Sequence, residues 1–284
     1  MSSDVDVTCV VLAYNQEAIV EEAIRSVFAQ KFGGRMEILL SDDASPDGTF
    51  EVMQRVAISY DGPHEIRLNC NPANLGTIRH VNRVFEIARG ELIVVNSGDD
   101  LSTPQRVAQL HARFVEMEPR PLMIHSPLQI IRKDGTATGA VLDINARIAK
   151  AGPHTAAISS VGCYGASCAW NRELFEIYGP MTETEAYGDL ISTYRAKLLG
   201  RLAHVDIPLV LYRQGGVSDI GSMTPEERLQ YKIRRQAVQI AVMRQRLADT
   251  IKVAPQRRRL INRIKSHITF MTQPPAQSTP ANDG

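Results

Sequence analysis

The chain has 284 residues, and its 32 lysines and arginines almost balance its 31 aspartates and glutamates, leaving a formal charge of +1. This balance excludes a histone-like protein that coats nucleic acid, and we expect no nucleic acid among its partners. No run of about 18 apolar residues predicts a membrane-spanning helix. The N-terminal residues lack the basic and apolar segments of a secretory signal, so we expect a cytoplasmic protein.

The first 120 residues or so alternate between strand and helix patterns, which is typical of a mostly parallel α/β sheet flanked by helices. Short apolar runs predict buried strands, and apolar residues three or four positions apart predict the helices between them. Thr103 is expected to cap a fourth helix with Pro104 at its first position. The predicted strands are 5–12, 36–40, 65–68 and 92–95, and the predicted helices are 16–30, 50–58 and 78–88.

The pattern changes in the second part of the chain. Asp134 and Gly135 predict a hairpin turn. Extended segments are expected over 122–131, 166–170 and 202–212, and helices from Arg172 and over 187–199.

From Thr224 the composition shifts to two basic amphipathic helices. Residues 222–272 hold 12 basic and three acidic side chains, whereas residues 1–221 hold 20 basic and 27 acidic ones. Such helices suit either an anionic membrane surface or docking on the main domain or on a second copy of the chain. The first apolar stripe is Leu229, Ile233, Ala237, Ile240, Met243, Leu247 and Ile251, and the second is Leu260, Ile264, Ile268 and Met271.

We therefore expect a main α/β domain over 1–221, a helical extension over 222–272 and a disordered tail over 273–284, which has three prolines and few apolar residues.

Polar residues follow three of the predicted strands, where ligands bind in a parallel α/β sheet. They are Tyr14 and Asn15, then the segment 41–49 with its three aspartates, then Asp99 and Asp100. Taken singly, these aspartates could form turns and helix caps. Because they recur at the ends of consecutive strands, we predict a binding site, in which crowded carboxylates need a cation or hydrogen-bond donors.

These segments resemble glycosyltransferase family 2. The resemblance is carried by Val-Val-Leu-Ala-Tyr-Asn (10–15), Ser-Val-Phe-Ala-Gln (26–30), Ser-Asp-Asp-Ala-Ser-Pro-Asp-Gly-Thr (41–49), Asn-Leu-Gly (74–76), Ala-Arg-Gly-Glu (88–91) and Gly-Asp-Asp (98–100). It covers about residues 5–215 and loosens after 110. It implies the GT-A fold, with a Rossmann-like, mostly parallel sheet, a nucleotide-binding half over about 1–110 and an acceptor-binding half over 111–221.

The resemblance also implies a nucleotide-sugar donor. Tyr14 would pack on the base, and main-chain groups around Leu12 and Asn15 would frame it. Asp43 would accept a hydrogen bond from a uracil ring, which favours a UDP-sugar.

Further residues are implied at the base and phosphate pocket. Asn74, Gly76 and Arg79 would close it, although Arg79 could instead be a solvated helix charge. Arg213 would contact the diphosphate or form a structural salt bridge.

A diphosphate needs neutralising before it leaves, and Mg²⁺ or Mn²⁺ with carboxylate ligands performs this in such enzymes. Asp100 is the implied metal ligand, and Asp99 would contact the ribose or the sugar and help to place the metal. Many relatives carry a histidine shortly after the pair that is Tyr212-Arg213 here, but this chain has none there. Metal binding is therefore expected to rely on Asp100, diphosphate and water, or to be weaker.

Asp189 matches the family's catalytic base, which would take the proton from an acceptor hydroxyl as that hydroxyl attacks the anomeric carbon. The alternative is an acidic residue favoured at a helix N-terminus by the helix dipole. The glutamate that usually precedes the base is Gly188 here, and Glu183 and Glu185 are nearby substitutes.

The acceptor site is expected near residues 143–168, where aromatic faces could pack on sugar rings. His154, Tyr164 and Trp170 are its candidates, and each could equally be structural.

The sequence thus predicts an inverting glycosyltransferase that moves a sugar to a hydroxyl of a saccharide or lipid-linked saccharide, in the cytoplasm or at the inner face of the membrane. The alternative is a non-catalytic nucleotide-sugar-binding or scaffold protein, for which Gly188 and the missing histidine argue.

Overall fold

The computed structural model describes residues 4–215 and 224–273. The predicted boundary at 221/222, and the predicted tail apart from Gln273, lie outside the described residues. The elements up to residue 116 are β1 (Val7–Ala13), α1 (Val20–Phe28), β2 (Met36–Asp42), α2 (Thr49–Ile58), β3 (Glu65–Cys70), α3 (Thr77–Ile87), β4 (Leu92–Ser97), β5 (Leu101–Ser102) and α4 (Arg106–Glu116).

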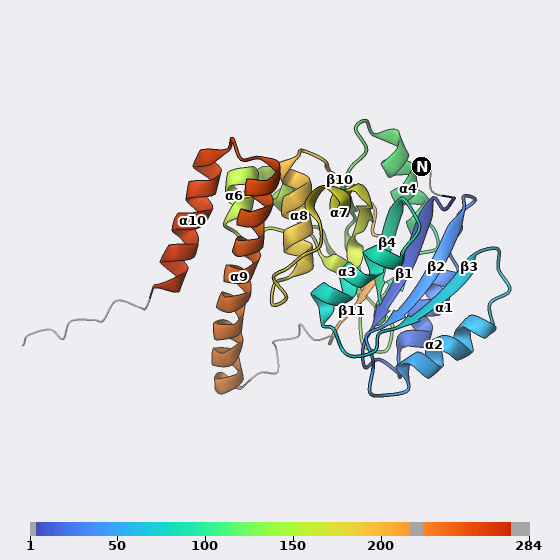
Figure 1. Cartoon of the computed structure of the whole chain (residues 1–284). Helices are drawn as coiled ribbons and strands as arrows, with labels where there is room; N and C mark the ends of the chain where they lie inside the picture. The colour runs from blue at the N-terminus through green and yellow to red at the C-terminus, as the bar shows by residue number, and fades with distance from the viewer. Residues whose placement is uncertain (1–3, 216–223, 274–284) are drawn as a thin grey trace, which may run out of the picture.

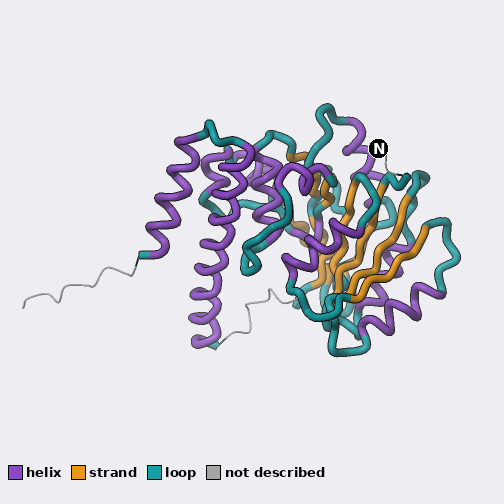
Figure 2. Tube along the Cα trace, in the orientation of Figure 1, coloured by secondary structure: helices purple, strands orange, loops and turns teal. Residues whose placement is uncertain are grey.

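The later elements include several short helices and strands (Figure 2). They are β6 (Met123–His125), β7 (Leu128–Ile131), β8 (Ala137–Leu142), α5 (Asn145–Lys150), α6 (Pro153–Ala157), the 3-10 helix η1 (Gly165–Ser167), β9 (Ala169–Asn171), α7 (Glu173–Tyr178), α8 (Gly188–Leu198), β10 (Leu202–His204), β11 (Val210–Arg213), α9 (Pro225–Val253) and α10 (Arg258–Thr272).

A seven-stranded sheet has the order β10-β6-β9-β4-β1-β2-β3, and every strand except β9 is parallel to its neighbours. The chain passes from β1 to β2 and β3 on one side and then places β4 on the other side of β1. The carboxyl ends of β1 and β4 therefore form a topological switch point, where open α/β sheets bind ligands. A second, four-stranded sheet has the order β5-β11-β7-β8.

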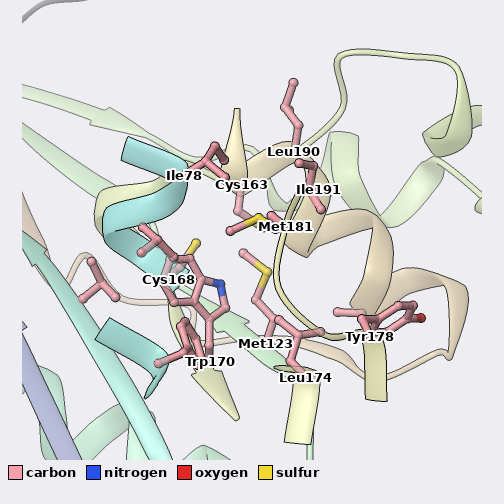
Figure 3. Packing of buried hydrophobic residues seen from close by; sticks show 14 of the residues in the cluster. Ile78, Met123, Cys163, Cys168, Trp170, Leu174, Tyr178, Met181, Leu190 and Ile191 are labelled. Carbon is pink, nitrogen blue, oxygen red and sulfur yellow. The ribbon is translucent and has the colours of Figure 1, made fainter. Parts of the chain in front are cut away.

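Helices cover both faces of the large sheet, which explains why its central strands are buried almost without alternation. One core packs side chains of β1 and β2 against α1, α2 and α4. The other core lies between the sheet and α3, α7, α8 and α9. Figure 3 shows side chains of this second core, including Trp170, Met123 and Met181, pointing toward one another. The α/β class, the mostly parallel sheet and the C-terminal helical part are confirmed.

Two predicted extended segments are each broken by a proline. Residues 122–131 divide at Pro127 into β6 and β7, and residues 202–212 divide before Val210 into β10 and β11, with Pro208 in the break. Proline lacks the N–H that a sheet ladder needs. Both segments leave the large sheet and enter the small one, where β7 and β11 pair in parallel. The predicted hairpin turn is present between β7 and β8.

The boundaries of three predicted elements are wrong: the starts of two helices and the extent of one strand. Helix α1 begins at Val20, because the N–H groups of Gln16 and Glu17 bond to the Thr49 hydroxyl and the Asp47 carboxylate. Helix α4 begins at Arg106, and the buried Thr103 hydroxyl has no partner within the described residues, so Thr103 does not cap it. Residues 165–167 form η1, and only then does β9 begin.

The predicted apolar stripe of α9 is confirmed only in part, at Met243, which is buried, and at Leu247, which packs against the same core. Leu229 and Ile233 are both 56% exposed and Ile251 is 46% exposed. Helix α9 turns a partly different face inward. This face includes the polar side chains of Gln245 and Asp249, which form hydrogen bonds with other buried or half-buried groups. This inward face includes Val238, Ala241, Val242, Gln245 and Asp249. The predicted stripe of α10 is confirmed, since its four residues pack in a third core with α6, α8 and α9.

Helix α9 lies at the left in Figure 1. Buried polar contacts attach it to the rest of the protein. The Arg195 guanidinium of α8 donates to both carboxylate oxygens of Asp249, at 2.8 and 3.0 Å, and both side chains are buried. Arg246 donates to the main-chain oxygens of Ala156, Ser159 and Leu190, at 2.6–2.9 Å. None of the described helices is long and apolar enough to cross a membrane.

The Arg195–Asp249 pair predicts a large loss of stability when one partner is removed. Asp249→Ala leaves a buried guanidinium without its counter-charge, which costs about 3–5 kcal/mol of unfolding free energy. The matched control is Glu86→Ala, which removes the partner of Arg83 in an exposed pair worth less than about 1 kcal/mol. Urea denaturation measures both, and equal losses would contradict the importance of the buried pair.

Candidate active site

Three strand ends meet at one edge of the large sheet. The N–H of Asp43, just after β2, donates to the Ala13 oxygen of β1, and the N–H of Gly98, just after β4, donates to the Leu12 oxygen. At position 98 a Cβ would lie 2.3 Å from the Gln16 side-chain oxygen, which would have to move, and 3.0 Å from the Ala13 Cβ, so glycine fits this close approach best. The polar segments predicted to share one edge therefore do so.

Asp42 and Asp47 shape the loop rather than the cavity. The Asp42 carboxylate accepts from the main-chain N–H of Ser45 at 2.8 Å, and Asp47 accepts from the N–H groups of Glu17 and Thr49. For these two aspartates the turn-forming alternative is the one that the structure supports.

Asp43 is buried and organises the loop that leads into α3. Its carboxylate accepts hydrogen bonds from the Asn71 amide at 2.7 Å and from the main-chain N–H groups of Leu75 and Gly76 at 2.9 Å. Gly76 has φ +76°, a conformation that favours glycine, and Asn74 also accepts from its N–H. These bonds account for the Asn-Leu-Gly motif at this position.

A cleft of about 390 Å³, which we call the Asp100 pocket, opens at this edge. Most of the predicted nucleotide-sugar residues line it, and Tyr14 is 47% exposed at its mouth. Gln16, Thr77, His80, Ser97 and Tyr212 also line it and were not predicted. The predicted residues in its lining are Leu12, Tyr14, Asp43, Asn74, Gly76, Asp99 and Asp100.

Three predicted residues do not line this pocket. Asn15 lies at its edge with φ +57° and donates its N–H to the Ser45 hydroxyl. Arg79 is exposed on α3, as its solvated alternative predicts. Arg213 is buried, and its guanidinium donates to the main-chain oxygens of Asp99 and Lys133. It also donates to the Glu22 carboxylate, which matches the salt-bridge alternative.

Asp99 and Asp100 are adjacent carboxylates, of which Asp99 is half-buried and Asp100 is buried. Burial is the main cause that raises the pKa of Asp100 to about 7, and the charge of Asp99 raises it further. The Asp100 carboxylate accepts from the Arg213 main-chain N–H at 2.9 Å, which offsets only part of this effect. Burial also raises the pKa of Asp99.

The oxygen chemistry of this pair fits a hard divalent cation. Mg²⁺ is commonly held by one or two carboxylates together with substrate phosphates and water. The described residues contain no group of three or more histidine, cysteine or acidic side chains arranged to hold a metal. Asp99 and Asp100 could therefore bind Mg²⁺ or Mn²⁺ only with further oxygen ligands from phosphate and water.

A second cavity of about 460 Å³, the Asp189 pocket, adjoins the first. Both are lined by Leu12, Gly76, Thr77 and Ser97. Its other side is formed by Trp170, by residues 184–189, and by Arg234 and Val238 of α9. Cavities of this size suit a nucleotide and a sugar.

Asp189 lies in the first turn of α8, facing this second cavity. Burial is the main cause that raises the pKa of its carboxyl to about 6, and the N–H of Leu190, at 2.7 Å, opposes the shift. A carboxyl with such a pKa can exchange a proton near neutral pH. At Gly188 an added Cβ would approach Ile78 to 3.3 Å, so this position has little room for a larger residue.

The remaining candidates divide between lining and structural positions. Glu185 lines the Asp189 pocket, whereas Glu183 does not. Trp170 lines it but is 96% buried in the core. The ring centroid of Tyr164 lies 6.4 Å from that of Tyr212. His154 is exposed on α6 and lines neither pocket.

Comparison with known proteins gives a family match. The model of the family described as "Glycosyl transferase family 2" matches residues 8–176. The putative glycosyltransferase EpsE of Bacillus subtilis is 34% identical over 142 residues, which are 50% of this chain and 50% of EpsE. The chain spans about a third to a half of the length of the curated relatives it matches.

Solved structures share the fold. Staphylococcus aureus TarS in complex with UDP has a TM-score of 0.61 at 15% identity, over 93% of this chain and 72% of that chain. The mannosyltransferase PcManGT of Pyrobaculum calidifontis, in complex with GDP-Man and Mn²⁺, has a TM-score of 0.56 at 19% identity, over 95% of this chain and 78% of that chain. These similarities confirm the predicted GT-A fold.

The raised pKa of Asp100 predicts a variant that is more stable than the wild type. An unfolded aspartate has a pKa near 3.9, so the folded protein binds this proton more tightly and its unfolding free energy falls as pH rises from about 4 to about 7. Asp100→Asn removes the charge and keeps an oxygen for the Arg213 N–H. At pH 8 without metal or nucleotide, it should gain about 1–4 kcal/mol of unfolding free energy.

At pH 4 the gain should be nearly absent, because Asp100 is then protonated in the wild type. The control is Asp134→Asn, in the exposed hairpin turn, where the pKa is lowered by bonds to Thr136 and no gain is expected. Denaturation at the two pH values measures the effect, and a gain of the same size at both would show that the charge of Asp100 is not its cause.

Proposed function

Because the chain belongs to glycosyltransferase family 2, we propose that it transfers a sugar from a nucleotide-diphosphate donor to a hydroxyl of a saccharide or lipid-linked saccharide, with inversion at the anomeric carbon. One observation carries this proposal. The pocket that holds the acidic pair Asp99 and Asp100 adjoins the pocket that holds Asp189, and four residues line both. A bound donor could therefore have its diphosphate at one end and its reacting carbon facing Asp189 at the other.

The nucleotide would occupy the Asp100 pocket. Tyr14 presents an exposed ring for packing on the base, and main-chain groups of Leu12 and Asn15 border the same edge. Asp43 uses three of its roughly four acceptor positions within the protein, which leaves one for a donor such as the uracil N–H. This remaining position favours a UDP-sugar, although TarS binds UDP and PcManGT binds GDP-Man.

Asn74 and Gly76 would close the pocket over the nucleotide, because Asp43 holds their loop in place. Arg213 would act from behind the acidic pair, since its own donors are engaged with protein groups. Its part is to position Asp99 and Asp100 rather than to touch the diphosphate.

Asp99 and Asp100 would hold a divalent cation together with the diphosphate. Mg²⁺ or Mn²⁺ bound there supplies positive charge that stabilises the departing diphosphate. The bound Mn²⁺ of PcManGT supports such a role. The protein's own contribution is to keep two carboxylates adjacent at the end of β4 although burial and mutual repulsion oppose their ionisation.

Asp189 would act as the general base. The acceptor hydroxyl gives its proton to the Asp189 carboxylate while its oxygen attacks the anomeric carbon from the side opposite the diphosphate. The carbon–oxygen bond to the diphosphate breaks in the same step, so the configuration inverts. Burial keeps the pKa of this carboxyl near 6, close to that of an efficient base at neutral pH.

The exposed side of the C-terminal helices would contact a further partner. Leu229 and Ile233 of α9 and Phe270 of α10 are more than half exposed among basic side chains. This surface suits an anionic membrane surface at the inner face of the membrane, or a second copy of the chain. Either would suit an enzyme that uses a lipid-linked acceptor from the cytoplasmic side.

The second candidate function is a non-catalytic nucleotide-sugar-binding protein, which Gly188 favours because it replaces an acid that the family usually carries. Asp189→Asn distinguishes the two. The variant should retain UDP binding and lose about 10²- to 10⁴-fold in kcat, because the amide cannot accept the proton. The assay is nucleotide release from UDP-, GDP- and dTDP-sugars with Mn²⁺ and saccharide acceptors.

Glu185→Gln and Glu183→Gln are the controls, since either acid could replace Asp189 as the base. We expect smaller losses from both. A larger loss from Glu185→Gln would move the base to that residue, and nucleotide binding without turnover on any donor would favour the non-catalytic protein.

The pKa of Asp189 predicts the pH profile of the reaction. At saturating donor and metal, kcat should rise as pH increases through about 6 and level off near pH 8, because only the ionised carboxyl accepts a proton. The residual rate of Asp189→Asn should lack this step. A wild-type rate that falls over the same range would indicate that the group acts as an acid.

A further inference from the structure

Helix α9 contributes an arginine to the Asp189 pocket. Arg234 lines this cavity, and Val238, one helical turn later, lines it too. Both residues continue the inward face that further along includes Ala241, Val242, Gln245 and Asp249, with spacings of three or four residues. Arg234 is thus the first residue of that face to extend beyond the core, and it extends over the cavity.

Buried contacts farther along α9 hold the helix that carries Arg234. Arg246 and Asp249 anchor α9 to α8 and α6 through buried hydrogen bonds, and the Gln245 oxygen accepts from the N–H groups of Thr182 and Glu183 at 2.7 and 3.2 Å. Arg234 lies about 18 Å from Arg246 along the helix axis. A helix held at one end therefore places Arg234 at this cavity, which the segment 184–189 also lines.

The charge of Arg234 is distinctive at this place. Among the described residues that line the two pockets, it is the only lysine or arginine, whereas Asp43, Asp99, Asp100, Glu185 and Asp189 are acidic. No hydrogen bond or ion pair occupies its guanidinium within the described part of the chain. Arg235, the next residue, is also exposed but does not line the cavity.

Its position separates Arg234 from the nucleotide diphosphate. Arg234 lines the Asp189 pocket and not the Asp100 pocket, so it faces the side where the acceptor would bind. Glu185 and Asp189 would repel an anionic acceptor from this side. A neutral acceptor needs no cation there, whereas an acceptor with a phosphate or a carboxylate does.

We propose that Arg234 is an acceptor-binding residue that recognises an anionic group, a phosphate or a carboxylate, on the acceptor. This inference rests on the proposed function, since it takes the Asp189 pocket as the acceptor side. Guanidinium groups bind both anions through paired, charge-assisted hydrogen bonds. Tyr187 also lines this pocket and is 47% exposed. Its ring offers an aromatic face for a sugar ring beside that anion.

The test measures binding of small probes to the full-length protein, first saturated with UDP and Mg²⁺ so that the nucleotide position is filled. The probes are glycerol phosphate, glucuronate and glucose, measured by calorimetry. At least one anionic probe should bind more tightly than glucose, and the preferred one distinguishes a phosphate from a carboxylate on the natural acceptor. Arg234→Gln should weaken that binding at least about tenfold.

Arg235→Gln is the matched control, because it removes the same charge from the adjacent position on the same helix. It should leave anion binding nearly unchanged, and Arg234→Lys should retain part of it. Equal loss in the two glutamine variants, or no preference for the anionic probes, would overturn the inference. UDP affinity should be the same in all variants. If the wild type binds no nucleotide, the proposed function itself fails, whereas UDP binding without Arg234-dependent anion binding refutes this inference alone.

Discussion

The crowding of buried carboxylates at the carboxyl ends of β2 and β4 is the constraint around which the site is built. Asp43 is compensated by three hydrogen-bond donors, so the protein itself satisfies most of its acceptor capacity. Asp100 receives one main-chain N–H and lies beside another acid, so its negative charge is largely uncompensated. Asp43 therefore serves mainly to shape the pocket, and the pair formed by Asp99 and Asp100 retains the capacity to bind a cation with phosphate.

A second network of buried polar contacts links the C-terminal helices to the same site. Helix α8 carries Asp189 in its first turn and Arg195 two turns later, and Arg195 is held by Asp249 of α9. Arg246 of α9 also bonds to the Leu190 oxygen, next to Asp189. Helix α9 also forms part of the wall of the Asp189 pocket, so a change in how it packs would alter the position of the proposed base. The opposite side of the C-terminal helices remains exposed and basic.

The sequence predicted the features that depend on local patterns. The alternation of strands and helices up to residue 116, the arrival of Asp43, Asp99 and Asp100 at one edge, and the helix that begins near Asp189 were predicted correctly, because strand ends and helix starts are encoded by neighbouring residues. The inward face of α9 was predicted only in part. Apolar periodicity favoured Leu229 and Ile233, whereas the buried face contains Asp249 and Gln245, whose partners Arg195 and Thr182 lie more than 50 residues away in the sequence. The place of Arg234 in the pocket depends on that packing, so no sequence pattern indicated it.

A crystal structure of the protein with UDP and Mn²⁺, with the manganese located by its anomalous scattering, tests the central claim most directly. The account predicts a manganese peak beside the carboxylates of Asp100 and Asp99, with the diphosphate on the same ion and the uracil between Tyr14 and Asp43. Nucleotide bound away from this edge of the sheet, or manganese with ligands that include neither Asp99 nor Asp100, would contradict it.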